Sequence, residues 1–198
     1  MDEPLSNLDA RLREEVRGKI RDLAKQLGAT VLYVTHDQIE AMAMADKIAL
    51  MSLGRLLQYG APMELYRAPN CSEVADFFGS VNWLSGTLVG PEAVDTKIGR
   101  LKISAHGCSG PEVVVGFRPE SLQILGEPDP VHPNVFEADL RSSIFLGDQF
   151  VYETTVGDFL VIGKSRFLPT CGGRRLRVCV EPADIMVFPR SQSLRSSV

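Results

Sequence analysis

The sequence predicts an α/β segment over residues 1–79 followed by an all-β barrel domain over residues 80–198. Three observations support this prediction. Apolar residues recur every three or four positions over residues 9–27, which is the period of a helix. An apolar, β-branched run over residues 30–35 follows, as in a buried strand of a parallel sheet. Beyond the first segment the helical spacing disappears and short alternating stretches replace it, which is typical of a small barrel or sandwich.

The first predicted helix covers residues 9–27. Apolar residues form one face of it, and charged residues occupy the other face. The apolar positions are Leu12, Val16, Ile20, Leu23 and Leu27. The side chain of Asp9 can accept a hydrogen bond from the free N–H groups at the start of the helix, and Gly28 can end it.

The other elements of the first segment are short and alternate between helix and strand, which indicates an α/β sheet. Turn residues and apolar runs set their limits. In chain order they are a strand at residues 30–35, a helix at 37–45, a strand at 47–53, a hairpin turn at 52–55 with a second strand ending at Gly60, and short helices beginning at Pro62 and Ser72.

The second segment contains many short strands separated by Gly, Pro and Asp. We place the domain boundary near residues 79–81, where the pattern changes. The predicted strands cover residues 83–89, 100–105, 112–117, 134–145, 150–156, 159–164, 176–181 and 184–188. Arg174, Arg175 and Arg177 alternate with apolar residues of one strand, so they are expected on its solvent face.

Composition excludes several classes of function. The net charge of −4 gives no electrostatic case for binding nucleic acid. The longest apolar runs are far shorter than the roughly 20 residues that a membrane-spanning helix needs, and no signal segment opens the chain. We therefore expect a cytoplasmic location without direct membrane insertion, and any membrane role must come through a partner.

The cysteines and two of the histidines suggest no site. The four cysteines lack a C-x-x-C pair, so reduced thiols are expected and a metal site involving them is not. They are Cys71, Cys108, Cys171 and Cys179. His106 and His132 fall in loop-like sequence without acidic or cysteine neighbours arranged as ligands, and no role is assigned to them.

One conjunction of motifs stands apart from this background. The chain reads D-E-P-L-S-x-L-D, then a helix, an apolar strand and T-H-D. This order resembles the second half of the ATP-binding subunit of an ABC transporter. The resemblance makes Asp2 and Glu3 the end of the Walker B strand, residues 6–9 the D-loop and His36 the switch histidine. Neither a G-x-x-x-x-G-K-[ST] phosphate loop nor an L-S-G-G-Q signature occurs in the 198 residues.

The resemblance implies a role for each of these residues. Asp2 would hold Mg²⁺ through its water shell, and Glu3 would take a proton from the attacking water. His36 would hydrogen-bond the γ-phosphate of ATP. The D-loop residues would lie across the interface between two subunits, beside the nucleotide. The residues expected to bind nucleotide and metal are thus Asp2, Ser6, Asn7 and Asp9, and the catalytic residues are Glu3 and His36.

The second half of the chain extends the resemblance. Residues 116–120 read G-F-R-P-E, and residues 145–148 read F-L-G-D before an aromatic-rich strand. Both resemble the oligonucleotide/oligosaccharide-binding-like (TOBE) domain of maltose, polyamine and ferric-iron importer ATPases. Gly116, Arg118 and Pro119 are interpreted as structural residues, because special backbone positions explain Gly and Pro directly. Trp83 is expected to pack with Phe77 and Phe78 at the junction of the two domains.

Two functions from different classes remain open. The chain is expected to be the C-terminal part of an energy-coupling ATPase that uses ATP and Mg²⁺, pairs with a second copy, and drives permease subunits from the inner face of the membrane. Alternatively, it is a non-catalytic dimerisation and regulatory module. Since a phosphate loop supplies most of the attraction for triphosphate, the 198 residues alone are expected to bind MgATP negligibly. Apolar faces of the first segment are expected to be exposed. In its motifs the sequence resembles polyamine and ferric-iron importers slightly more than sugar importers.

Overall fold

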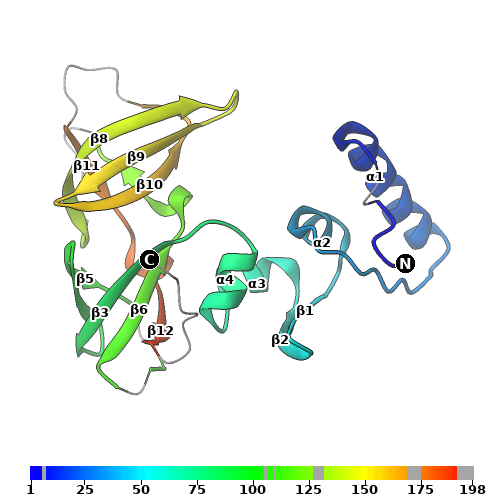
Figure 1. The fold of residues 1–198 in the computed structure, drawn as a ribbon, viewed down its shortest axis with the longest axis horizontal. Helices are drawn as coiled ribbons and strands as arrows, with labels where there is room; N and C mark the ends of the chain where they lie inside the picture. The colour runs from blue at the N-terminus through cyan, green and yellow to red at the C-terminus, as the bar shows by residue number, and fades with distance from the viewer. Residues whose placement is uncertain (6–7, 105–106, 109, 127–131, 169–174, 191–198) are drawn as a thin grey trace. The chain divides into compact units, whose positions relative to one another are not determined.

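The computed structural model describes residues 1–5, 8–104, 107–108, 110–126, 132–168 and 175–190. The chain divides into two compact units, Met1–Asn70 and Cys71–Val198 (Figure 1). The second unit therefore begins nine residues before the predicted domain start at residue 80.

Helix α1 of the first unit covers Ala10–Gln26, as predicted. Asp9 caps it, because Asp9 Oδ1 accepts a 3.0 Å hydrogen bond from the Leu12 N–H. Gly28 follows the helix with φ +60°, and the Ala29 N–H donates back to the Ala24 carbonyl at 2.9 Å. This bond marks a Schellman ending, which needs a residue tolerant of the left-handed conformation. Both ends predicted for this helix are confirmed.

The predicted strand at residues 30–35 is wrong as a strand. These residues make a single parallel bridge, between Asp2 and Val34. Around it the Val34 N–H donates to the Met1 carbonyl and the Glu3 N–H to the Val34 carbonyl, both at 2.9 Å. An apolar β-branched run becomes a strand only where a ladder of partners pairs with it. In the described part of the first unit, the segment ending at Glu3 is too short to supply more than one pair.

The rest of the first unit follows the predicted order. Its elements are α2 (Gln38–Met44), β1 (Ile48–Ser52), β2 (Arg55–Gly60) and α3 (Pro62–Arg67). Strands β1 and β2 pair antiparallel across Leu53 and Gly54, whose φ values of +47° and +75° match a type I′ hairpin turn. This hairpin and the single parallel bridge are the sheet structure of the described residues here. A parallel P-loop α/β sheet is therefore not confirmed.

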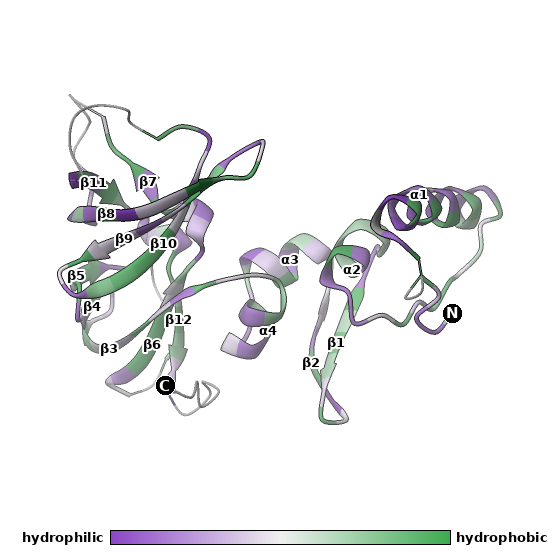
Figure 2. Cartoon of the chain, turned by 45° about the horizontal axis from the view of Figure 1, so that its top comes forward, coloured by the Kyte–Doolittle hydropathy of each residue, from purple (hydrophilic) through white to green (hydrophobic). Residues whose placement is uncertain are grey.

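Apolar surface of the first unit is exposed, as the sequence predicted. Leu23 of α1 and Leu27 directly after it are exposed, and Leu32 is 81% exposed. The hydrophobic residues of α1 are coloured green in Figure 2. The buried apolar residues of this unit are few: Leu5, Ile48, Leu50 and Leu65.

The second unit begins with a short helix and is otherwise built of antiparallel strands. Two five-stranded sheets have the orders β12-β6-β3-β4-β5 and β10-β9-β8-β11-β7. The elements are α4 (Ser72–Phe77), β3 (Asn82–Gly90), β4 (Ala93–Thr96), β5 (Gly99–Lys102), β6 (Glu112–Phe117), β7 (Gln123–Ile124), β8 (Val135–Phe145), β9 (Phe150–Val156), β10 (Phe159–Ser165), β11 (Arg175–Cys179) and β12 (Met186–Pro189), with 3₁₀ turns at Pro119–Ser121 and Pro182–Asp184.

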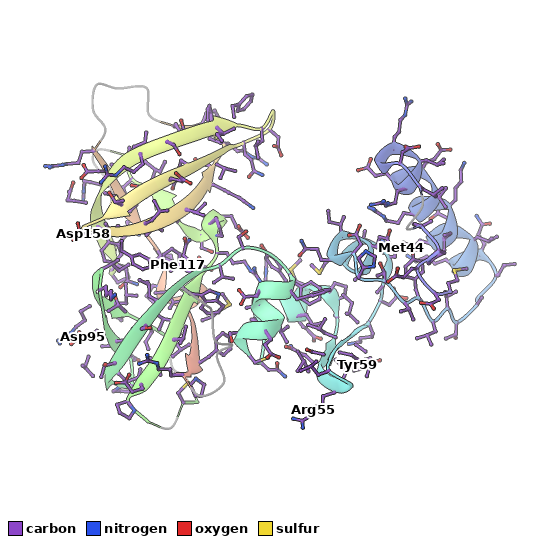
Figure 3. All side chains as sticks on the ribbon, in the orientation of Figure 1. Met44, Arg55, Tyr59, Asp95, Phe117 and Asp158 are labelled. Atoms are coloured by element: carbon purple, nitrogen blue, oxygen red, sulfur yellow. The ribbon has the colours of Figure 1, made fainter. Side chains whose placement is uncertain are left out.

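Both sheets contribute to one hydrophobic core. Val115 and Phe117 from one sheet and Tyr152 and Val178 from the other are all buried in it; Phe117 is labelled in Figure 3. The all-β prediction is confirmed, and the shared core is compatible with an OB-like barrel. All eight predicted strands are present, while β4 and β7 were not predicted.

Two buried asparagines connect the sheets through their side chains. Asn82 of β3 exchanges two 2.8 Å hydrogen bonds with the backbone of Ile162 in β10. Asn134, before β8, accepts from the Lys102 N–H at 2.7 Å and donates to the carbonyls of Lys102 and Val180 at 2.9 and 3.0 Å. Each amide thus satisfies backbone groups that would otherwise be buried without partners.

The motif residues of this unit have structural roles. Arg118 is buried and donates from Nη2 to the Ala75 carbonyl at 3.3 Å. A Cβ at Gly116 would lie 2.3 Å from the ring of Trp83, so only glycine fits there. Trp83 donates to Asp76 of α4 at 2.7 Å and packs against Phe188, so its ring partner is not the predicted pair of phenylalanines.

The predicted solvent face of the arginine-rich strand is confirmed where the structure describes it. Arg175 and Arg177 of β11 are exposed and pair with Asp139 and Glu137 of β8. Arg174 lies outside the described residues.

Candidate functional site

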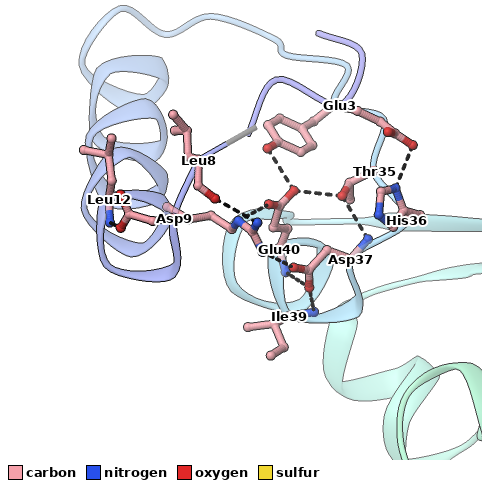
Figure 4. A network of polar contacts seen from close by, with 11 residues as sticks. Glu3, Leu8, Asp9, Leu12, Thr35, His36, Asp37, Ile39 and Glu40 are labelled. Carbon is pink, nitrogen blue, oxygen red and sulfur yellow. Dashed lines mark hydrogen bonds and ion pairs between the residues drawn. The ribbon is translucent and has the colours of Figure 1, made fainter. Parts of the chain in front are cut away.

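The structure brings together the predicted catalytic glutamate and the predicted switch histidine, called here the acid–histidine pair. Glu3 Oε1 and His36 Nδ1 lie 2.7 Å apart and share a hydrogen bond (Figure 4). Both side chains face solvent, with 45% of Glu3 and 75% of His36 exposed. The hydrogen bond to Glu3 and the negative charge of Glu3 raise the pKa of His36 above 6.5.

Backbone pairing explains how residues so far apart in sequence meet. The parallel bridge between Asp2 and Val34 aligns the two segments, so the residues that follow, Glu3 and His36, emerge at the same end. Glu3 has φ +40°, a left-handed conformation that is uncommon for a residue with a side chain. Asp2, which precedes Glu3 in the chain, is also exposed. The geometry thus brings the side chains of Glu3 and His36 together, with Asp2 next to them in the bridged segment.

The predicted D-loop residues are placed only in part. Ser6 and Asn7 lie outside the described residues. Asp9 is occupied in capping α1. The carbonyl of Leu8 accepts a 3.0 Å hydrogen bond from Arg13 Nη2. Of the residues predicted to bind nucleotide, Asp2 and Asp9 are described and exposed, and Asp2 is the chain neighbour of Glu3.

A buried carboxylate lies behind His36, and the sequence reasoning missed it. Glu40 of α2 is 3% exposed. Glu40 Oε2 accepts hydrogen bonds from Tyr33 at 3.0 Å and from Thr35 at 2.7 Å. Burial and the hydrogen bond to Glu40 raise the pKa of Tyr33 to about 12. The position of Glu40 in the sequence could have indicated this contact. Glu40 is three residues after the helix cap Asp37, where a side chain can turn back toward the preceding segment.

Arg13 connects the predicted D-loop segment with the histidine segment. Besides its bond to Leu8, its guanidinium lies 3.6 Å from Asp37 Oδ2 and 4.0 Å from Glu40 Oε1 (Figure 4). Asp37 in turn caps α2 by accepting from the Ile39 N–H at 2.7 Å. The start of α1 and the start of α2 are therefore held together by charged groups that flank the acid–histidine pair.

Comparison with known proteins identifies the family. The ferric-iron import ATP-binding protein FbpC 1 of Rhizobium meliloti is 38% identical over 169 residues, which cover 82% of this chain and 46% of that protein. The glycerol-3-phosphate import ATP-binding protein UgpC of Cupriavidus pinatubonensis is 34% identical over 214 residues, covering 98% of this chain and 56% of that protein. The chain belongs to the family of ABC importer ATP-binding subunits. The trehalose/maltose import ATP-binding protein MalK of Thermococcus litoralis is a third relative, 39% identical over 84% of this chain and 48% of its own length.

The chain spans about half the length of these curated ABC importer subunits. No protein family model matches it. Among solved structures, the cytoplasmic molybdate-binding protein ModG, with molybdate bound, aligns with 55% of this chain and 95% of its own length at 10% identity. The TM-score of this alignment is 0.45. Within the described residues, no helix is long and apolar enough to pass through a membrane.

Proposed function

We propose that Asp2, Glu3 and His36 form the hydrolytic end of the nucleotide site in an energy-coupling ATPase subunit of an ABC import system. The observation that carries this proposal is the 2.7 Å contact between Glu3 and His36 beside the bridge that bears Asp2. Phosphoryl transfer to water needs a group that orients the water, a donor to the terminal phosphate and a metal. Glu3 would orient the water, His36 would donate to the terminal phosphate, and Asp2 would hold the metal.

The chemistry of each side chain suits its proposed part. Glu3 accepts a proton from the attacking water, since a carboxylate is a general base within hydrogen-bonding reach of water. His36 has a raised pKa, so more of it carries the proton that it donates to the γ-phosphate. Asp2 offers an exposed carboxylate oxygen, which fits Mg²⁺ because this ion prefers hard oxygen ligands and keeps several waters. When bound, Mg²⁺ would neutralise phosphate charge.

The proposal extends to organisation and partners. Residues 1–79 represent the C-terminal half of the ATPase domain, and residues 80–198 represent a TOBE, OB-like domain. The subunit pairs with a second copy in a homodimer, and permease subunits bind the dimer at the inner face of the membrane. The named relatives import ferric ions, glycerol-3-phosphate and trehalose/maltose, so their similarity favours no single cargo.

A second candidate is a non-catalytic dimerisation and regulatory module. It is favoured by one observation: the 198 residues contain neither the phosphate loop nor the signature motif. Without those backbone N–H groups and the loop lysine, Asp2 and Glu3 place negative charge beside a negative ligand. The isolated chain is expected to bind MgATP negligibly. Micromolar affinity in a calorimetric titration would contradict this expectation.

A chimeric subunit separates the two candidates. The part of Rhizobium meliloti FbpC 1 that precedes its match to this chain is fused in front of these 198 residues, and MgATP binding and hydrolysis are measured. The ATPase proposal expects turnover that Glu3→Gln lowers about 10²–10⁴-fold while MgATP binding remains, because a general base is lost. Glu15→Gln, on the exposed face of α1, is the matched control. A chimera that binds MgATP but turns over equally fast with and without the Glu3→Gln change would refute the role of Glu3.

A further inference from the structure

A second cluster of ligand-type side chains lies in the all-β unit, where β11 ends. His132, Cys179 and Glu181 each place one nitrogen, sulfur or oxygen atom within 4.8 Å of the other two. His132 Nδ1 and Glu181 Oε1 are already hydrogen-bonded at 2.8 Å. From the sequence, His132 receives no role and no metal site is expected at the cysteines. The fold brings His132 beside Cys179 and Glu181, although these residues are far apart in the sequence.

Strand geometry explains the convergence. Cys179 and Glu181 are two residues apart at the end of β11, and alternate residues of an extended chain project to the same side. Cys179 pairs with Val135 in the ladder between β11 and β8. His132 precedes Val135 in the segment that leads into β8. Because β8 and β11 are antiparallel, His132 lies beside the residues that follow Cys179.

The support around the cluster is rigid. Asn134, 1% exposed, donates to the Val180 carbonyl at 3.0 Å, and the Val180 N–H donates to the Asn134 carbonyl at 3.2 Å. These two bonds fasten the backbone between His132 and Glu181. A site whose ligands are held by neighbouring backbone loses less entropy when it takes up an ion.

We propose that His132, Cys179 and Glu181 bind a divalent transition-metal ion, Zn²⁺ in the first place. One nitrogen, one sulfur and one carboxylate oxygen form a donor set that suits Zn²⁺ and excludes Mg²⁺ and Ca²⁺, which take oxygen ligands. Ligands of a tetrahedral Zn²⁺ at about 2.0–2.3 Å lie roughly 3.3–3.8 Å from one another. The widest separation in the cluster, at most 4.8 Å, must close by about 1.0–1.5 Å to reach this spacing.

The exposure of the three side chains indicates how an ion reaches the cluster and what its fourth ligand is. Cys179 is fully buried, whereas the side chains of His132 and Glu181 are 21% and 39% exposed. The ion therefore enters from the side of His132 and Glu181 and keeps a water molecule as its fourth ligand. Binding displaces the thiol proton of Cys179 and the hydrogen bond between His132 and Glu181. The bound ion fastens the segment before β8 to the end of β11.

Cobalt substitution tests the site in the full chain. Co²⁺ is added to metal-free, reduced protein, and absorption is recorded in the near-ultraviolet and visible ranges before competition with Zn²⁺. The proposal expects one equivalent to produce a sulfur-to-cobalt charge-transfer band and visible bands of a four-coordinate ion. One equivalent of Zn²⁺ should abolish both. Absence of the charge-transfer band, or octahedral Co²⁺ bands only, would overturn the proposal.

Variants assign the ligands. Glu181→Gln and His132→Gln change partly exposed groups, so both variants should fold. Each should weaken Zn²⁺ binding by at least roughly 10–100-fold, which is the loss expected when a residue that only hydrogen-bonds a metal ligand is removed. Cys179→Ser should abolish the charge-transfer band. Cys108→Ser, which removes a thiol outside the cluster, is the matched control and should leave Zn²⁺ affinity unchanged. Equal Zn²⁺ affinity in the Glu181 and His132 variants and the parent chain would show that an ion binds elsewhere, and would refute this site.

Discussion

Thr35 donates a 2.7 Å hydrogen bond from Oγ1 to Glu40 Oε2, and the same Thr35 oxygen accepts the Asp37 N–H at 3.0 Å. The Tyr33 hydroxyl also donates to Glu40 Oε2, at 3.0 Å. Glu40 is 3% exposed, and burying a carboxylate costs much free energy unless donors surround it. The residues on both sides of exposed His36 therefore belong to a part-buried polar network around Glu40, which fixes the backbone position of His36.

Removing the Glu40 carboxylate should weaken the first unit. Glu40→Ala removes the acceptor of two part-buried hydrogen bonds, from Tyr33 and Thr35, and each such bond contributes about 0.5–1.5 kcal/mol, or about 1–3 kcal/mol together. We expect the free energy of unfolding, measured by urea denaturation and circular dichroism, to fall by about that amount. Glu15→Gln breaks the exposed pair with Lys19 and serves as the control, with nearly unchanged stability. Equal stability of the two variants would contradict the role of the network.

Tyr33 should titrate well above an ordinary tyrosine. Burial and the Glu40 carboxylate raise its pKa from 10.0 to about 12. The folded state therefore holds the phenolic proton more tightly than the unfolded state, and this contribution to stability is complete below pH 10 and is lost as pH rises to about 12. Ultraviolet titration of phenolate, with Tyr33→Phe to identify the transition, measures the value. Glu40→Gln should lower the pKa; an unchanged transition would show that Glu40 does not act on Tyr33.

The acid–histidine pair should be visible in the titration of His36. Its hydrogen bond to Glu3 raises the folded-state pKa above 6.5, so the stabilisation is full below pH 6.5 and is lost as pH rises through the raised value. Nuclear magnetic resonance of the imidazole C–H protons reports this pKa, and His36→Gln identifies the signal. In Glu3→Gln the pKa should fall toward 6.5. The same His36 pKa in both proteins would mean that the pair does not form in solution.

Gly116 should not tolerate a side chain. A Cβ there would lie 2.3 Å from the Trp83 ring, so the ring or β6 must shift. Overpacking of this kind costs typically about 1–3 kcal/mol, and we expect Gly116→Ala to lower the free energy of unfolding by that amount. Gly90, on β3 of the same sheet, is the control, because a Cβ added there would meet no atom within 4 Å. Trp83, the single tryptophan, reports both transitions by fluorescence.

Elements that depend on local pattern could be predicted from the sequence. Helix α1, its cap Asp9 and its ending at Gly28 follow from residues within one stretch. The hairpin around Gly54 does so too, because its turn conformation favours specific residue types. The strand predicted at residues 30–35 failed since pairing partners, and not β propensity, decide whether a ladder forms.

Parts of the site that depend on distant pairing were less accessible. Glu3 and His36 were associated through motif resemblance, and the 2.7 Å contact agrees with that association. Glu40 was overlooked because glutamate is rarely buried, so composition gives no warning of a buried one. The meeting of His132 with Glu181 depends on the register of β8 against β11, which no local pattern encodes.

Asn82 and Asn134 link the two sheets of the all-β unit through their side chains. Backbone ladders within each sheet do not depend on side-chain identity, whereas these links need an amide that both donates and accepts. The polar contacts between the sheets are therefore more sensitive to substitution than the ladders. Replacement of either asparagine would leave backbone groups of Ile162 or Lys102 without these partners, while the strands themselves keep their pairing.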